Sequence, residues 1–295
     1  MTLTEQPAPA TPRGSARSRQ RSRLVRRFLR RPLPLAGLVV LVLLALLAIF
    51  AGVLTSDPGA NDFTALLSPP SAAHPLGTDD LGRDVLARIA YGARVSMEAG
   101  VLATALSIAI GVPLGLIAGY YRGLADLVIS RLTDVVLAFP FLILAVGLAA
   151  ILGPSLRNVV IALGVTRVPA FIRITRGEVL SLREQDYVAG AVADGASDAR
   201  ILRRYILPNA LSPLIVQATV SIPEAILGEA VLSFLGLGVQ PPTPSWGTML
   251  ASAQGFLAQA PYLAIFPGVA IMLATLSFNL LGDGLRDVLD PKATR

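Results

Sequence analysis

Long apolar runs separated by shorter polar segments dominate the hydrophobicity pattern of this chain. Six runs are long enough to cross the ~30 Å hydrocarbon core of a bilayer as helices, and most charged residues lie between them. The predicted spans are residues 33–54, 99–120, 127–152, 156–172, 211–235 and 262–281. The pattern therefore predicts an all-α polytopic membrane protein with six transmembrane helices.

The polar interval between the fourth and fifth spans, residues 183–209, has the pattern of two short helices. Residues 186–194 have a helix-compatible composition, and Gly195 suits the end of that helix because glycine adopts conformations that cost other residues more. Ser197 is placed to cap a second helix, and Pro208 is expected to stop or redirect the chain after it. The second helix would carry arginines on one surface and apolar contacts on another: Arg200, Arg203 and Arg204, then Ile201, Leu202, Tyr205 and Ile206. We predict an amphipathic hairpin that projects from the membrane into a groove of a partner protein.

Composition supports the membrane class. Hydrophobic residues make up 54% of the 295 residues, charged residues 15%, and the mean hydropathy is +0.66, whereas soluble domains carry about 25% charged residues. The net charge of +6 and the pI near 10.3 do not indicate a nucleic-acid partner, because the basic residues gather at the ends of apolar runs and not in a stripe with aromatic residues between them. The absence of cysteine excludes disulfides and thiolate metal sites.

The distribution of basic residues predicts that both termini are cytoplasmic. Residues 1–31 form a tail rich in Pro, Ser, Thr and Arg, which we interpret as disordered and solvated in preference to a specific lipid-binding segment. The apolar run that follows exceeds the usual 7–15 residues of a signal peptide, so we expect a retained helix. Residues 236–261 contain no lysine or arginine and are placed outside. The segment 55–95 is also expected on the outer side of the membrane. Its arginines oppose that placement, but its aspartates offset their charge.

Two carboxylates lie inside the predicted fifth span. Glu224 and Glu229 are five residues apart and need not share a helix face. Ionisable groups at membrane depth are costly unless they face water or a partner. Each is therefore a candidate pathway or gating residue, with hydrogen bonding to a neighbouring helix or subunit as the alternative.

Two other polar features have structural interpretations. Arg131 and Asp134 lie three residues apart in the third span, where they could pair along one helix face. His74 is the only histidine and has no second ligand cluster beside it, so we expect a structural residue and no metal site.

The hairpin interval resembles the cytoplasmic loop of permease subunits from ATP-binding-cassette (ABC) importers, binding-protein-dependent transport system inner-membrane components. That loop follows the pattern E-A-A, three residues, G, nine residues, I-x-L-P. Ala191, Gly195, Leu207 and Pro208 match it at the required spacing. The positions that depart from the pattern are Ala189, Gly190, Asp194 and Tyr205.

Longer blocks narrow the resemblance. The sequences HPLGTDDLGRDVLARIAYGARVSM at 74–97, EAVLSFLGLGVQPPTPSWGTML at 229–250 and FNLLGDGLRDVLDP at 278–291 are similar to the C-type permease of dipeptide, oligopeptide and nickel importers. The likeness covers residues 24–291. It implies a type I ABC importer permease fold, with a five-helix core and an additional N-terminal helix. The implied divisions are a basic tail 1–31, a first helix and outer segment 32–95, a core 96–285 containing the loop 183–209, and a cytoplasmic tail 286–295.

The resemblance also implies a set of partners in a bacterial or archaeal inner membrane. These are a second, homologous permease subunit, two cytoplasmic ABC ATPases, an extracytoplasmic solute-binding protein and the surrounding membrane lipid. ATP and Mg would be bound by the ATPases, and no cofactor by this chain. The residues implied in ATPase docking are Asp186, Tyr187, Val188, Ala191, Gly195, Ala196, Ser197, Leu207 and Pro208.

Catalysis by the chain itself is not expected. It contains no G-x-x-x-x-G-K-[ST] sequence and, with one histidine, no Ser/His/Asp constellation. The predicted function is therefore import of dipeptides or oligopeptides as a transporter subunit. Import of nickel or a nickel chelate is the alternative within the same architecture. A membrane scaffold or an ATPase-independent carrier is a more remote alternative, because neither explains the hairpin pattern.

Overall fold

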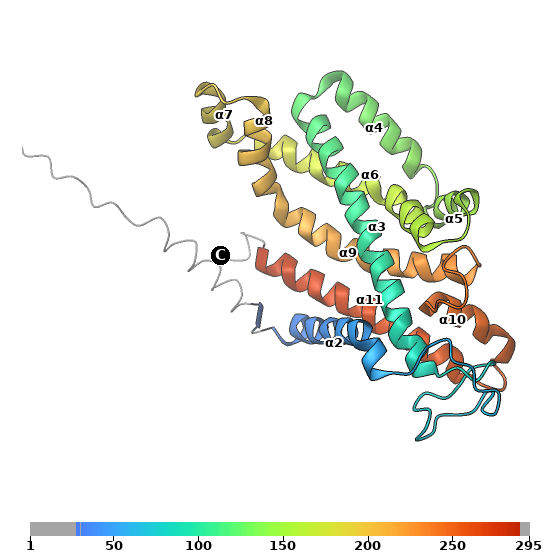
Figure 1. Cartoon of the computed structure of the whole chain (residues 1–295). Coiled ribbons are helices and arrows are strands. Elements are labelled where there is room, and N and C mark those ends of the chain that lie inside the picture. The colour runs from blue at the N-terminus through green and yellow to red at the C-terminus, as the bar shows by residue number, and fades with distance from the viewer. Residues whose placement is uncertain (1–27, 30, 290–295) are drawn as a thin grey trace, which may run out of the picture.

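We describe the protein from a computed structural model that places residues 28, 29 and 31–289 (Figure 1). Every regular element among these residues is helical, apart from an isolated bridge between Thr78 and Asp84. The α-helices are α2 Pro32–Leu54, α3 Val85–Tyr121, α4 Gly123–Leu137, α5 Phe141–Leu152, α6 Leu156–Arg183, α7 Asp186–Ala193, α8 Asp198–Ile201, α9 Leu207–Phe234, α10 Trp246–Ala253 and α11 Tyr262–Leu289. A π-helix, Leu202–Ile206, and a 3₁₀-helix, Gln254–Phe256, complete the set. The predicted all-α fold is confirmed. The predicted basic tail 1–31 lies outside the described residues except for 28, 29 and 31.

The described residues contain five helical segments long and apolar enough to cross a membrane. They are α2, α3, α6, α11 and the continuous segment Asp198–Phe234, which includes α8 and α9. A sixth span is obtained if α4 and α5 are counted as one broken crossing. The polytopic fold is therefore confirmed, and six spans are reached only when α4 and α5 count as one. The last span is longer than expected, since α11 continues to Leu289 and includes the first residues of the predicted C-terminal tail.

The prediction of one continuous third span at 127–152 is wrong. The chain forms α4 and α5 at an angle of 90° to each other, separated by residues 138–140. Pro140 explains the break, because it has no backbone N–H and disfavours a helical conformation at the preceding Phe139. Hydropathy alone misses this break, since the junction is as apolar as the helices on either side.

The second span also begins earlier than predicted, at Val85 and not at residue 99. The Asp84 carboxylate caps α3 by accepting a hydrogen bond from the Ala87 backbone N–H at 2.9 Å. With 37 residues, α3 is about 55 Å long at a rise of about 1.5 Å per residue. The expected boundary at 95/96 therefore falls inside a continuous helix, and α3 extends well beyond one bilayer core.

Glycines allow α3 and α6 to pack closely along their length. Gly111, Gly115 and Gly119 recur every fourth residue of α3 and face α6. A Cβ added at any of them would meet a Cβ of α6 at 2.5–2.7 Å, namely that of Phe171, Thr175 or Val179. Only glycine leaves room for this approach, as is common at helix contacts in membranes.

The hairpin helices α7 and α8 lie at one end of the molecule, and α10 and the segment 55–84 lie at the other (Figure 1). The beginning of α2 and the end of α11 are joined by an ion pair between Arg31 and Asp287. At the α10 end, the fully buried Trp246 donates its indole N–H to the Ile89 carbonyl at 3.2 Å. The Trp246 contact joins the start of α10 to α3.

Candidate functional site

The turn between α7 and α8 has the geometry that the sequence predicted for Gly195. Its φ is +72°, a region that non-glycine residues rarely adopt. The Gly195 N–H donates to the Val192 carbonyl, and the Ala196 N–H donates to the Ala191 carbonyl, both at 3.0 Å. These two bonds form a Schellman motif, which satisfies the last carbonyls of α7 and reverses the chain.

Two details of the predicted hairpin differ from the structure. Ser197 occupies the N-cap position of α8, but its side chain makes no capping hydrogen bond. Pro208 does not end the helix, since α8, the π-helix and α9 form one continuous helical segment. The proline lies at the start of α9, directly after the π-helix. The widened π-turn accommodates the residue that lacks an N–H, and α9 continues from it.

The hairpin has an apolar core of its own. Val188 and Ala191 from α7 pack with Ile201, Ile206 and Val179 of α6. Leu202 and Tyr205 are partly buried against this cluster, so the apolar residues of the second helix make their contacts within the chain.

Polar contacts tie the hairpin to the end of α3. The Tyr120 hydroxyl donates to the Asp198 carboxylate at 2.9 Å. Arg183 donates to the Tyr120 carbonyl, and Arg122 pairs with Glu184 at 2.7 Å. Sequence reasoning missed these residues, because their partners are far apart in the chain. They attach the hairpin firmly to α3 and α6.

The structure divides the residues predicted to dock on a partner into exposed and enclosed groups. Asp186, Tyr187, Gly195, Ser197 and Pro208 are exposed, Ala196 and Leu207 are partly buried, and Val188 and Ala191 are buried. Val188 and Ala191 therefore support the hairpin from within. Val192, which the prediction left out, is 56% exposed and adds an apolar contact to the outer surface.

Glu229 is enclosed at the junction of α3, α9 and the segment before α10. It is 1% exposed and accepts hydrogen bonds from the Ser96 hydroxyl at 2.8 Å and the Ser233 hydroxyl at 2.6 Å. The Ser96 hydroxyl in turn accepts from the Trp246 backbone N–H at 3.3 Å. These contacts match the helix-to-helix alternative considered for Glu229, because the carboxylate is satisfied within the chain.

We expect Glu229→Ala to destabilise the protein by about 2–4 kcal/mol, because it leaves a void and removes the acceptor of two buried hydroxyls. Glu229→Gln keeps the volume and one acceptor, and should lose less than half of that. The thermal midpoint of the detergent-solubilised protein measures both. Equal thermal midpoints for Glu229→Ala and the parent protein would contradict the role of Glu229 in linking α9 to α3.

Glu224 has a different environment, in the middle of α9. Its carboxylate forms an ion pair with the Arg167 guanidinium of α6. The Arg167 guanidinium also lies over the ring of Phe141, the first residue of α5, at 4.0 Å from the ring centroid. Helices α5, α6 and α9 thus meet at one charged contact, next to the break between α4 and α5.

An open pocket of about 480 Å³ lies between α4 and α6. Asp134 pairs there with Arg173 at 2.8 Å. Arg176 donates to both carboxylate oxygens of Asp126, at 2.6 and 2.7 Å. The expected pairing of Asp134 with Arg131 along α4 is therefore wrong, because α6 supplies the partner.

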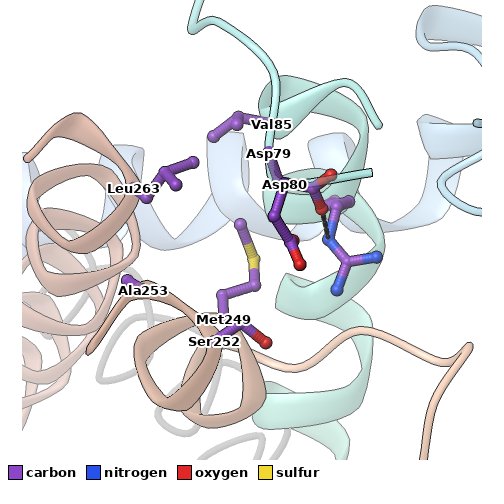
Figure 2. A pocket seen from close by; sticks show the side chains of 8 residues that line it. Asp79, Asp80, Val85, Met249, Ser252, Ala253 and Leu263 are labelled. Carbon is purple, nitrogen blue, oxygen red and sulfur yellow. Dashed lines mark ion pairs between the residues drawn. The ribbon is translucent and has the colours of Figure 1, made fainter. Parts of the chain in front are cut away.

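The cavity at the α10 end is much smaller, about 20 Å³, and its lining is shown in Figure 2. Asp79 there accepts from Arg83 at 2.7 Å. The His74 ring contacts Asp84, the cap of α3, at 3.0 Å, which agrees with a structural role. Within the described residues, no cluster of three or more His, Cys, Asp or Glu could hold a metal. A water-sized cavity cannot accept a peptide.

Comparison with known proteins identifies the family. The model described as "Binding-protein-dependent transport system inner membrane component" matches residues 111–295. The chain belongs to this permease family. A second model, the N-terminal TM domain of oligopeptide transport permease C, matches residues 20–70, which include α2. The resemblance expected from the hairpin and the longer sequence blocks is confirmed.

Curated relatives of this permease cover most of its length. It is 49% identical over 261 residues to the dipeptide transport system permease protein DppC of Alkalihalophilus pseudofirmus, covering 88% of this chain and 86% of the relative. It is 47% identical to DppC of Haemophilus influenzae, covering 88% and 90%. It is also 47% identical to the glutathione transport system permease protein GsiD of Pectobacterium atrosepticum, covering 90% and 89%. These relatives are transport proteins and not enzymes.

Proposed function

We propose that this chain is a permease subunit of an ATP-driven importer of dipeptides or oligopeptides and forms half of its translocation pathway. The observation that carries the proposal is identity of 47–49% to two dipeptide permeases over 88% of the chain. The glutathione permeases among the relatives also handle a short peptide. Nickel import, the alternative considered from sequence, finds no comparable support in these names.

The proposed partners are a second permease subunit, two cytoplasmic ATPases that bind ATP and Mg, and an extracytoplasmic solute-binding protein. The α7–α8 end is placed in the cytoplasm, with both termini. The arginines at this end support that orientation under the positive-inside rule, and the lack of lysine and arginine in 236–261 agrees with an outer location. The core 96–285 would then lie within an inner membrane, with α2 as an addition at its edge.

The proposed mechanism couples the hairpin to the helices on either side of it. An ATPase would bind the exposed residues of the hairpin, including Tyr187, Val192 and Gly195. Closure of the two ATPases on nucleotide would displace the hairpin, and with it α6 and α9. The two permease subunits would then rock between outward-open and inward-open states.

A strain that lacks the gene tests the substrate directly. We expect uptake of radiolabelled L-alanyl-L-alanine to fall to background in this strain and to return when the gene is restored, with nickel uptake unchanged. Loss of nickel uptake with normal dipeptide uptake would favour the alternative. Uptake of both solutes at the parent rate would contradict the importer proposal.

Purification tests the partners. The tagged chain, extracted from its native membrane in mild detergent, should co-purify with two ATPases and a second permease identified by mass spectrometry. Recovery of the intact chain alone, under conditions that preserve other membrane complexes, would count against the proposed assembly.

A further inference from the structure

The ion pair between Arg167 and Glu224 joins α6 to α9 near the middle of both helices. Both helices belong to the segments that qualify as membrane spans. The pair therefore lies at membrane depth, where charged side chains are costly and usually functional. It is distinct from the other ion pairs of α6, which connect to α4.

Arg167 keeps unused hydrogen-bonding capacity. Its side chain is 18% exposed and stacks on Phe141, while the Glu224 carboxylate occupies a terminal nitrogen. The Nε atom is buried and has no hydrogen-bond partner. A guanidinium presents five donors in a planar fork that suits a carboxylate. Arg167 therefore retains N–H donors that its contact with Glu224 does not use.

Glu224 opens toward the outside of the chain. Its side chain is 41% exposed, although it lies at membrane depth. A carboxylate in contact with lipid would be strongly unfavourable, so this face meets water or another protein. Gln217 and Ser221, which hydrogen-bond to each other at 3.2 Å, lie on the same face of α9, seven and three residues before Glu224. This face of α9 therefore carries three polar side chains over about two turns, of which Gln217 and Glu224 are partly exposed and Ser221 is buried.

The pair also spans the two helices that carry the hairpin. The chain leaves α6 directly into α7, and it passes from α8 through the π-helix into α9 without a break. Any displacement of the hairpin relative to the membrane must shift the end of α6, α9 or both. The contact between Arg167 and Glu224 is therefore placed to open or close as the hairpin moves.

We propose that Arg167 and Glu224 act as an exchange pair for the charged termini of a zwitterionic peptide. The peptide ammonium replaces Arg167 on the Glu224 carboxylate, and the peptide carboxylate replaces Glu224 on the Arg167 guanidinium. This inference rests on the proposed function and assigns a substrate class to one contact in the pathway.

The exchange avoids an unpaired charge at every stage. Breaking an ion pair in a low-dielectric region is costly when one partner is left alone. A zwitterion supplies both replacement charges together, so each protein charge keeps a charge-assisted hydrogen bond. When the peptide leaves, the side chains pair again and close the contact. A solute with one charge satisfies only one side, and the pair therefore selects for free peptide termini.

Three double variants, expressed from the native locus so that the partners are present, test the exchange. The neutral pair is Arg167→Met with Glu224→Gln. The exchanged pair is Arg167→Glu with Glu224→Arg, which keeps opposite charges in reversed positions. The matched control is Arg31→Met with Asp287→Asn, which removes an arginine–carboxylate ion pair from an exposed site outside the hairpin. Each is assayed for initial uptake of radiolabelled L-alanyl-L-alanine, for co-purified partner proteins and for ATP hydrolysis by the purified complex.

We expect the neutral pair to reduce dipeptide uptake at least about tenfold, as loss of charge-assisted hydrogen bonds implies. Co-purification of the partners and ATP hydrolysis should stay at parent levels. The complex that carries the exchanged pair should assemble and hydrolyse ATP. It should transport dipeptide as poorly as the neutral pair, because the guanidinium is then on α9 and the carboxylate on α6. The control should transport at the parent rate.

Three results would overturn the exchange. Uptake at the parent rate by the neutral pair would show that the charges do not act on the peptide. Restored uptake by the exchanged pair would show that the two charges only hold α6 and α9 together. Loss of the second permease from the neutral complex would reassign Glu224 to a subunit contact. The unmodified chain is measured first, in the same cells. If it takes up no dipeptide, the proposed function itself fails, whereas differences among variants of a transporting parent concern the exchange alone.

Discussion

Gly195→Trp is expected to lower peptide uptake at least about tenfold while leaving membrane insertion intact. The φ of +72° at Gly195 costs an L-residue about 1–2 kcal/mol. An added Cβ meets no atom of this chain within 4 Å, so the interior has no reason to unfold. The indole would instead project from the exposed turn that we place against an ATPase. Uptake of labelled dipeptide, with membrane content measured on the same cells, tests this.

Two controls separate the conformational effect from the contact effect. Gly195→Asn should retain most of the uptake, because asparagine tolerates a positive φ and is small. Gly255→Trp places the same ring at the α10 end, also with no atom of the chain near its Cβ. Normal uptake by well-inserted Gly195→Trp would refute the coupling role of the hairpin.

Gly115→Val is expected to have the largest effect on stability. A Cβ at Gly115 would lie 2.5 Å from the Thr175 Cβ and 2.8 Å from the Ile172 carbonyl oxygen. Neither atom is the flexible end of a long side chain, so α3 and α6 must separate. Overpacking of this kind costs about 1–3 kcal/mol and sometimes more. The thermal midpoint of the purified protein in detergent should fall clearly, with a lower yield of folded protein.

Gly147→Val is the matched control for that change. Gly147 is also a helical glycine, but an added Cβ there meets nothing within 4 Å. The two variants share the same change in helix propensity and differ in crowding. If both lower the midpoint equally, the close approach of α3 and α6 is not what makes Gly115 necessary.

The limits of sequence reasoning show most clearly at α4 and α5. Residues 127–152 look like one span because hydropathy measures transfer into lipid and carries no information about direction. Pro140 breaks the helix through the backbone, a local effect that was visible in the sequence but was not weighed there. The early start of α3 was missed because hydropathy does not detect helices whose first turns are polar. Its first turns are polar enough to resemble a loop, and they become helical by packing on Trp246 and by the Asp84 cap.

The hairpin was largely predictable because its determinants are local. A glycine at a positive φ, helix-forming residues on both sides and an alternation of apolar and basic positions define it within a short stretch. The attachment of the hairpin was not predictable in the same way. Tyr120 and Asp198 are 78 residues apart, and nothing in either neighbourhood indicates the other.

The sequence by itself determined the membrane class, the family and the turn at Gly195, because each depends on composition or on short-range pattern. Only the tertiary structure distinguished Glu224 from Glu229. Both are carboxylates within one apolar helix, yet one is enclosed by Ser96 and Ser233 and the other faces Arg167 and the outside of the chain. The burial and partners of a charge depend on which helices pack against it. That information resides in long-range contacts and not in the residues beside it.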